Sequence, residues 1–112
     1  MKEKIFKKIK INGVTLKNRF VVSPMCQYSS SNGNPISWHY KHLTSLGNSG
    51  AGLLMIEATA IEKRGKITHS DMCLENNTQF KKLKKLVKNI KKKSDTKIGL
   101  QISHSGRKGS TE

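Results

Sequence analysis

Three short apolar runs and one helical repeat divide this chain into its elements. Residues 19–22 and 52–56 are nearly uninterrupted in apolar side chains, which is typical of buried strands in a parallel sheet. Residues 97–102 are more mixed and predict a third strand. From residue 80 to residue 90 the apolar positions recur every three or four residues with lysines between them, which predicts an amphipathic helix.

A β-hairpin and a further helix are predicted in the first half of the chain. Residues 5–11 alternate loosely, and residues 14–16 follow Asn12-Gly13, a dipeptide that favours a tight hairpin turn. Ser37 is suited to be the N-cap of a helix over residues 38–46, which the glycines that follow would end. The chain is therefore expected to open with a hairpin and to continue as alternating strands and helices.

The order strand, helix, strand, helix, strand predicts an α/β fold with a parallel sheet. Residues 62–77 are polar and mixed, so we expect an irregular loop there. A (β/α)8 TIM barrel needs about 250 residues, and this chain of 112 residues could supply about three of its strands. The polar tail, residues 103–112, contains no helix to complete the third unit. We therefore expect residues 1–112 to be one truncated domain, the N-terminal portion of an incomplete barrel.

A strong positive charge raises one alternative function. Lysine and arginine number 22 against 7 acidic residues, giving a formal net charge of +15, which would ordinarily suggest a polyanionic partner such as nucleic acid. Many of the lysines, however, lie between Lys81 and Lys97 on the expected outer face of one helix, and no aromatic residues are interleaved with them for base stacking. We expect a solvated face, with neither nucleic acid nor membrane as partner. A small basic nucleic-acid-binding protein is the alternative.

Cysteine and histidine usage argues against a disulfide framework and against a metal site. Cys26 and Cys73 are too few and too far apart for either, and they indicate a reducing, cytoplasmic setting. His39 and His42, on the first expected helix, are predicted to be structural or solvent-facing, since no acidic or cysteine partner stands near them. The first ten residues are charged and no continuous apolar stretch follows, so neither a secretory signal nor a membrane span is expected.

In a barrel the catalytic residues follow the C-terminal ends of the strands, and here those positions carry distinctive segments. Residues 23–28 are Ser-Pro-Met-Cys-Gln-Tyr, residues 57–60 are Glu-Ala-Thr-Ala, and residues 101–107 are Gln-Ile-Ser-His-Ser-Gly-Arg. With Leu-Lys-Asn-Arg at residues 16–19, in this order and spacing, they resemble the old yellow enzyme family, also described as the NADH:flavin oxidoreductase / NADH oxidase family. The resemblance runs over nearly the whole chain, and Cys26 marks the bacterial thermophilic-like subgroup.

The resemblance implies a flavoprotein oxidoreductase of the ene-reductase type. Members of the family are FMN-containing TIM barrels that take hydride from NADH or NADPH and pass it to the β-carbon of an activated alkene. The implied partners are FMN, NAD(P)H and a small-molecule alkene, and the parent protein is expected to be a homo-oligomer. The family's substrate-anchoring residues, second active-site tyrosine and FMN-phosphate loops come from later strands. We therefore expect this chain to be inactive alone.

Carried over by position, the resemblance assigns the first strand-end segment to the flavin and the substrate. Ser23, Pro24 and Met25 would lie along the flavin ring, on a loop stiffened by the proline. The Cys26 thiol would sit beside the N5/O4 edge and adjust the reduction potential, and the Tyr28 hydroxyl would point to the substrate side. These last two are the expected catalytic residues. Without the surrounding motif, a lone cysteine is more often a small buried hydrophobic residue, and a loop tyrosine a surface contact.

The other two segments would complete the contacts with the ring. Ala58 would line the pyrimidine part, being small enough to let the backbone approach, and the Gln101 amide would donate and accept at the O2/N3 edge. Outside this context Gln101 would be a surface or capping amide. His104 and Arg107 would lie in the loop beside the flavin, where Arg107 would help to stabilise negative charge on the reduced ring. Cys73 departs from the family, whose members usually have glycine there.

Overall fold

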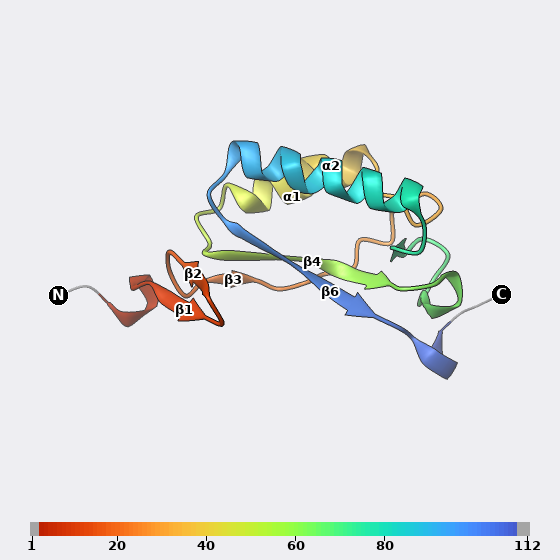
Figure 1. Cartoon of the computed structure of the whole chain (residues 1–112), viewed down its shortest axis with the longest axis horizontal. Coiled ribbons are helices and arrows are strands. Elements are labelled where there is room, and N and C mark those ends of the chain that lie inside the picture. The colour runs from red at the N-terminus through yellow and green to blue at the C-terminus, as the bar shows by residue number, and fades with distance from the viewer. Residues whose placement is uncertain (1–2, 110–112) are drawn as a thin grey trace.

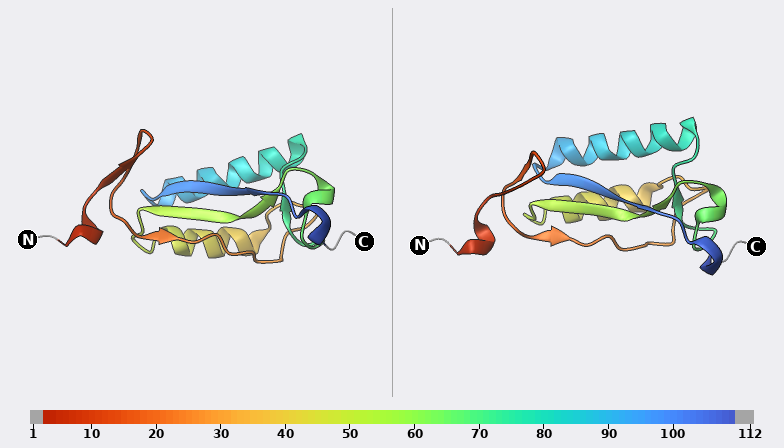
Figure 2. Two further views of the ribbon diagram at one scale, coloured as in Figure 1. Left: turned by 90° about the horizontal axis from the view of Figure 1, so that it is seen from below. Right: turned by 60° about the horizontal axis from the view of Figure 1, so that its bottom comes forward.

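The chain folds into one parallel sheet with two helices on one face, and a hairpin at its N-terminal end. The computed structural model describes residues 3–109. Both helices lie above the sheet in Figure 1, and the turned views in Figure 2 show that no helix of the described residues covers its other face. The sheet is therefore open on one side.

The predicted hairpin is confirmed. β1 (Ile9–Ile11) pairs antiparallel with β2 (Val14–Leu16), and a short 3-10 turn, η1 (Lys4–Phe6), precedes them. The turn residues Asn12 and Gly13 both have positive φ, 46° and 87°, which a two-residue turn needs to match the twist of its strands. Asparagine and glycine tolerate this backbone better than other residues, so the turn follows from the sequence.

The three predicted strands form the parallel sheet, with β4 (Leu53–Ala60) at its centre. β3 (Val21–Val22) pairs with the start of β4, and β6 (Lys97–Ser103) pairs along most of the length of β4 on the other side. The prediction that β3 is a buried strand is wrong, because Val21 is 50% exposed. The reason is that β3 lies at the edge of this sheet and no helix covers its open face.

A short fourth strand corrects the prediction of an irregular loop after β4. β5 (Met72–Cys73) pairs in parallel with Thr59 and Ala60 at the end of β4. The same loop contains a 3-10 turn, η2 (Lys63–Gly65). A strand of two residues is too short to show a period in the sequence. Cys73 has no positive φ, so its backbone does not need the glycine that the family resemblance led us to expect there.

The first predicted helix is present, but its N-cap differs from the prediction. α1 (Ser37–Gly47) has Ile36 as its N-cap, and Ser37 is the first helical residue. The Ile36 backbone N–H donates to Nδ1 of His39 at 3.0 Å. The N-cap side chain makes no hydrogen bond at this end, and the ring of His39 instead accepts the backbone N–H of the N-cap residue.

The second predicted helix is also present and begins before the apolar repeat. In α2 (Asn77–Lys93), Oδ1 of the N-cap Asn76 accepts the backbone N–H of Gln79 at 2.9 Å, and Oε1 of Gln79 accepts the backbone N–H of Asn76 at 3.2 Å. This reciprocal pair is a capping box. Phe80, expected on the apolar face, is 52% exposed, since the buried position at this end of α2 belongs to Gln79. The Phe80 ring lies near the ammonium group of Lys84.

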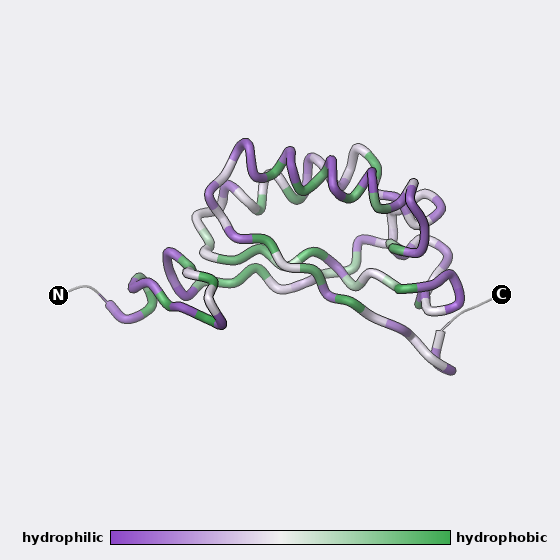
Figure 3. Tube along the Cα trace, viewed as in Figure 1, coloured by the Kyte–Doolittle hydropathy of each residue, from purple (hydrophilic) through white to green (hydrophobic). Residues whose placement is uncertain are grey.

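The hydrophobic core lies between β4 and the two helices. Its members are seven buried apolar residues: Leu43, Leu54, Ile56, Met72, Leu83, Leu86 and Ile90. Figure 3 shows the apolar positions of α2 toward the sheet and its polar positions outward, and all the lysines of α2 are exposed. The prediction of a solvated lysine face is therefore confirmed. Within residues 3–109, neither helix is long and apolar enough to cross a membrane.

Candidate functional site at the strand ends

A β-bulge in β4 brings two of the predicted site residues together. Ile56 pairs with Leu100 and Thr59 pairs with Ile102, so Glu57 and Ala58 of β4 stand opposite the single residue Gln101 of β6. The sequence prediction ended this strand at Ile56, whereas β4 continues to Ala60. Bulges are frequent beside active sites because they redirect a side chain. Here the bulge places Ala58 and Gln101 at the same level of the sheet.

The segment after β3 lies against the same bulge. The backbone N–H of Gln27 donates to Oε2 of Glu57 at 2.9 Å. The Cys26 thiol lies within hydrogen-bonding reach of the Ala58 backbone and the Tyr28 side chain. The structure therefore brings together residues from the ends of three strands, as the family resemblance predicts for the segments after β3, β4 and β6.

Several of these residues are accessible from solvent at the strand ends. Ser23, Met25 and Gln101 are exposed and Cys26 is half-buried, whereas Ala58 is buried with only a methyl group at the bulge. The backbone N–H groups of Met25 and Cys26 have no hydrogen-bond partner among the residues that the structure describes. The edge of a planar ring that carries both donors and acceptors would fit this arrangement. The free N–H groups of Met25 and Cys26 can donate, the Gln101 amide can donate and accept, and Ala58 is small.

The environment of Cys26 keeps its thiol protonated. Burial raises the pKa of the Cys26 thiol above its ordinary value, and the carboxylates of Asp71 and Glu57 raise it further. The hydrogen bonds from the Ala58 backbone and the Tyr28 side chain oppose this shift without cancelling it. Since the thiolate is the nucleophilic form of cysteine, the site is suited to contact through a neutral thiol rather than to covalent catalysis.

The loops after β4 and β6 meet at a histidine–carboxylate pair and at Ser105, whose backbone N–H and hydroxyl donate to the carbonyls of Gly65 and Lys66. Nε2 of His104 lies 2.8 Å from Oε1 of Glu62, and Nδ1 of His104 accepts the backbone N–H of Gly106 at 2.9 Å. The ring proton is therefore on Nε2 and is donated to the carboxylate. This hydrogen bond, followed by the charge of Arg64, lowers the pKa of Glu62. Arg107 is exposed in the 3-10 turn η3 (Gly106–Lys108).

A buried polar pair that the sequence did not predict lies behind the site. His39 is fully buried, and its Nε2 lies 3.4 Å from Oε1 of Glu57, which is 4% exposed. The prediction that no acidic partner stands near His39 is thus wrong, because the bulge turns Glu57 toward α1. The two residues are far apart in sequence, and no pattern in the sequence predicts the bulge. Within residues 3–109 no group of three or more histidine, cysteine or acidic residues is arranged to hold a metal ion.

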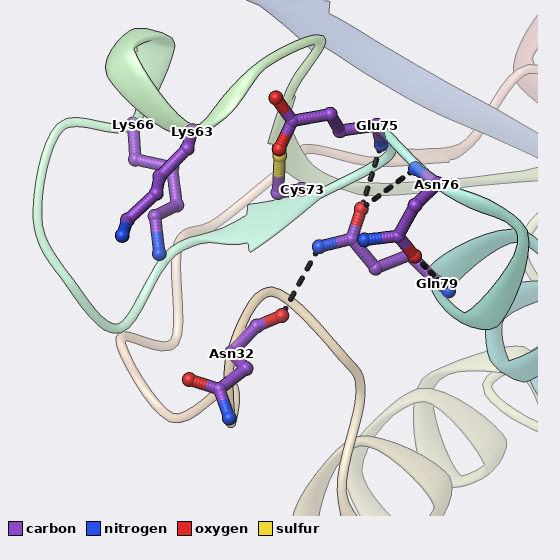
Figure 4. Close-up of a pocket in the computed structure, with 7 residues that line it drawn as sticks. All are labelled: Asn32, Lys63, Lys66, Cys73, Glu75, Asn76 and Gln79. Atoms are coloured by element: carbon purple, nitrogen blue, oxygen red, sulfur yellow. Dashed lines mark hydrogen bonds between the residues drawn. The ribbon is translucent and has the colours of Figure 1, made fainter.

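A separate polar pocket of about 220 Å³ lies beside the start of α2 (Figure 4). Its lining residues are Asn32, Lys63, Lys66, Cys73, Glu75, Asn76 and Gln79. In Figure 4 the Gln79 amide joins the two sides of the pocket: Oε1 accepts the backbone N–H groups of Glu75 and Asn76, and Nε2 donates to the Asn32 carbonyl at 3.1 Å. These bonds anchor the loop of Asn32 to the helix start, which accounts for the buried amide without a ligand.

Comparison with known proteins matches most of the chain to one family. A sequence model of the NADH:flavin oxidoreductase / NADH oxidase family matches residues 4–112. An NADH:flavin oxidoreductase of Gibberella zeae is 43% identical over 107 residues, covering 96% of this chain and 26% of the relative. NADPH dehydrogenases of Listeria monocytogenes and Bacillus subtilis are 43% and 38% identical, over 31% and 33% of their length. The chain thus spans about a quarter to a third of these relatives.

Solved structures show the same fold. 2-Naphthoyl-CoA reductase superposes with a TM-score of 0.87 at 26% identity, covering 96% of this chain and 16% of that one. The old yellow enzyme from Pichia sp. AKU4542 gives 0.84 at 25% identity, covering 95% and 28%. Morphinone reductase in complex with tetrahydroNAD gives 0.85 at 21% identity, covering 96% and 29%, and bears on the fold alone. The predicted fold, part of a TIM barrel, is confirmed.

Proposed function

The chain belongs to the NADH:flavin oxidoreductase / NADH oxidase family, and on that basis we propose that it is the N-terminal part of an FMN-dependent oxidoreductase of the ene-reductase type. When bound, FMN supplies hydride transfer from NAD(P)H to the β-carbon of an activated alkene. The observation that supports this proposal is the meeting of Cys26, Ala58 and Gln101 at one bulge, on the ends of three parallel strands. Active sites of barrels lie at that end of the strands.

In this proposal the chain binds the ring of the cofactor from one side. Ser23, Pro24 and Met25 would lie along the ring, and the free backbone N–H groups of Met25 and Cys26 would donate to it. Ala58 would leave space for the ring to approach the backbone of β4, and the exposed amide of Gln101 would both donate and accept at its polar edge. Together these residues hold the ring and orient it.

Two side chains would face the reacting positions. The neutral thiol of Cys26 would lie beside the ring and adjust its reduction potential, in keeping with a pKa that burial raises. Tyr28, 53% exposed, would orient the substrate with its hydroxyl group. His104 and Arg107 would form the rim of the site in the loop after β6, where the positive charge of Arg107 favours an anionic ring.

We also infer a cytoplasmic location. Cys26 and Cys73 are both free thiols. Free cysteines without a disulfide framework are usual in a reducing compartment. An oxidoreductase that uses NAD(P)H would find its co-substrate there.

A titration of the chain with FMN and with riboflavin tests the binding part of this proposal. We expect weak, saturable quenching of flavin fluorescence with similar affinity for the two ligands, because the chain contributes ring contacts and riboflavin shares that ring without the phosphate. The Gln101→Ala variant should weaken binding, whereas Asn89→Ala, on the far side of the sheet in α2, should not. Absence of saturable quenching, or a strong preference for FMN, would count against the assigned contacts.

A chimera tests the activity. Residues 1–112 would replace the matching segment of the Bacillus subtilis NADPH dehydrogenase, to which the chain is 38% identical over 114 residues. We expect the chimera to retain FMN and to oxidise NADPH in the presence of an activated alkene such as 2-cyclohexenone. A folded chimera that holds FMN but transfers no hydride to any conjugated alkene would contradict the ene-reductase assignment.

A further inference from the structure

Glu57 is a buried carboxylate that the proposed cofactor contacts do not use. It is 4% exposed, and each of its oxygens faces a different element. Oε2 accepts the backbone N–H of Gln27 at 2.9 Å, and Oε1 lies 3.4 Å from Nε2 of His39. Burial of a carboxylate is costly unless its oxygens have partners. The position of Glu57 thus depends on the loop after β3 and on α1 together.

The partner histidine is oriented from its other side. Nδ1 of the fully buried His39 accepts the backbone N–H of Ile36 at the start of α1. A neutral imidazole has one donor and one acceptor nitrogen, so the proton is on Nε2. This buried nitrogen lies 3.4 Å from Oε1 of Glu57 and makes no other hydrogen bond among the residues that the structure describes.

Gln27 connects Glu57 and α1 to the segment Met25–Tyr28. Its backbone N–H is held by Glu57, its side-chain Nε2 donates to the Met25 carbonyl at 2.8 Å, and its Oε1 accepts the indole N–H of Trp38 at 3.0 Å. The next residue, Tyr28, has a φ of 51°, a backbone conformation that a bulky side chain adopts only when its surroundings enforce it. The segment Met25–Tyr28 is thus fixed from β4 and from α1.

We propose that Glu57 and His39 are positioning residues that act through Gln27 to fix the segment Met25–Tyr28, and so orient the Cys26 thiol and the Tyr28 hydroxyl. The significance of that orientation for catalysis rests on the proposed function, whereas the positioning itself is a property of this chain. It assigns a role to two residues that touch neither the cofactor nor the substrate in the proposed site.

Amide hydrogen exchange of Gln27 tests the proposal on the 112-residue chain without flavin. In Glu57→Ala the Gln27 N–H loses its acceptor, and its exchange should accelerate about tenfold or more, since a hydrogen bond to a charged group is at stake. Glu57→Gln keeps an oxygen acceptor in the same place and should restore most of the protection. Exchange of the core amides of Leu54 and Ile56 should be unchanged in both variants, which separates positioning from loss of overall stability.

Two further readouts address the histidine and the thiol. The 15N chemical shifts of His39 should report the tautomer with the proton on Nε2, and the other tautomer would remove His39 from the proposal. In a Cys73→Ser background, Glu57→Ala should increase the alkylation rate of the Cys26 thiolate because the segment is released. Asp71→Asn is the matched control: it also removes a nearby negative charge, so it should lower the pKa of Cys26 without changing the exchange of Gln27.

The outcomes separate this inference from the proposed function. If Gln27 exchanges at the same rate in Glu57→Ala as in the unchanged chain, the positioning role is overturned, whatever flavin binding shows. If the exchange depends on Glu57 but no flavin binds, the positioning stands and the cofactor assignment fails. Acceleration of Gln27, Leu54 and Ile56 by the same factor would show a general structural role and would also overturn the proposal.

Discussion

Gly33 combines a left-handed backbone with close packing, so a substitution there has a defined cost. Its φ is 77°, and an added Cβ would lie 2.7 Å from Cβ of Cys73 and 2.7 Å from Nε2 of Gln79. We expect Gly33→Ala to lower the free energy of unfolding by about 1–3 kcal/mol or more, measured by urea denaturation, since strain and overpacking add. Gly13→Ala is the control: its φ is 87° but nothing lies within 4 Å, so a similar loss there would refute the packing argument.

Glu62 makes the stability of the fold depend on pH, and the sign of this dependence follows from its hydrogen bond to His104. The Nε2–H of His104 lowers the pKa of Glu62, and the charge of Arg64 is the second cause. A depressed pKa in the folded state stabilises the fold above the unfolded pKa, and this contribution is lost as the pH falls through the folded pKa. In a 13C NMR titration of the Glu62 carboxyl, His104→Ala should raise its pKa more than Arg64→Ala does. The reverse order would show that the loops do not meet through this pair.

Single residues were predictable where a motif carried them, and unpredictable where only the fold brings them together. Cys26, Ala58 and Gln101 stand in strand-end segments, and the structure places all three at the bulge. Glu57 and His39 face each other across β4 and α1, yet each belongs to a segment whose pattern gives no sign of the other. Pairing of this kind depends on the direction of a side chain, which a one-residue change in register reverses.

At the scale of elements, α2 is fixed by its apolar face and not by its lysines. Leu86 is fully buried against the core, so Leu86→Ala should lower the free energy of unfolding by about 2–5 kcal/mol. Lys85→Ala, at the adjacent exposed position, should change it by no more than about 0.5 kcal/mol. Urea denaturation of both variants measures the difference, and equal losses would mean that the lysine face is packed rather than solvated.

The elements themselves were predictable according to their length and local chemistry. The hairpin, both helices, β4 and β6 follow from turn residues and from apolar periods. β5 consists of two residues, Met72 and Cys73, and exists because it pairs with the end of β4 rather than because of its own pattern. The cap of α1 could not be predicted from the pattern either. Serine is the usual capping residue, whereas here Nδ1 of His39 accepts the backbone N–H of Ile36.

The whole molecule is longer and more open than a compact domain of its size. Its radius of gyration is 15.1 Å, with extents of 55 × 28 × 22 Å, whereas about 13 Å is expected for a compact chain of this length. β3 and β6 are the two edges of the sheet beside β4, and apolar side chains remain exposed on them: Val21 is 50% and Ile102 72% exposed. This is the surface that a partial barrel leaves uncovered.

Such edges should cause the isolated chain to self-associate, and the net positive charge of the chain should oppose this association. Unpaired strands are templates for pairing with another chain, but the net charge of +15 opposes contact until salt screens it. We expect sedimentation velocity to show self-association that increases with salt and that Ile102→Lys, on the edge strand β6, suppresses. Ile61→Lys is the matched control, since Ile61 is 55% exposed but follows the end of β4. Association that decreases with salt, or that responds equally to both substitutions, would show that the edges are not the contact surface.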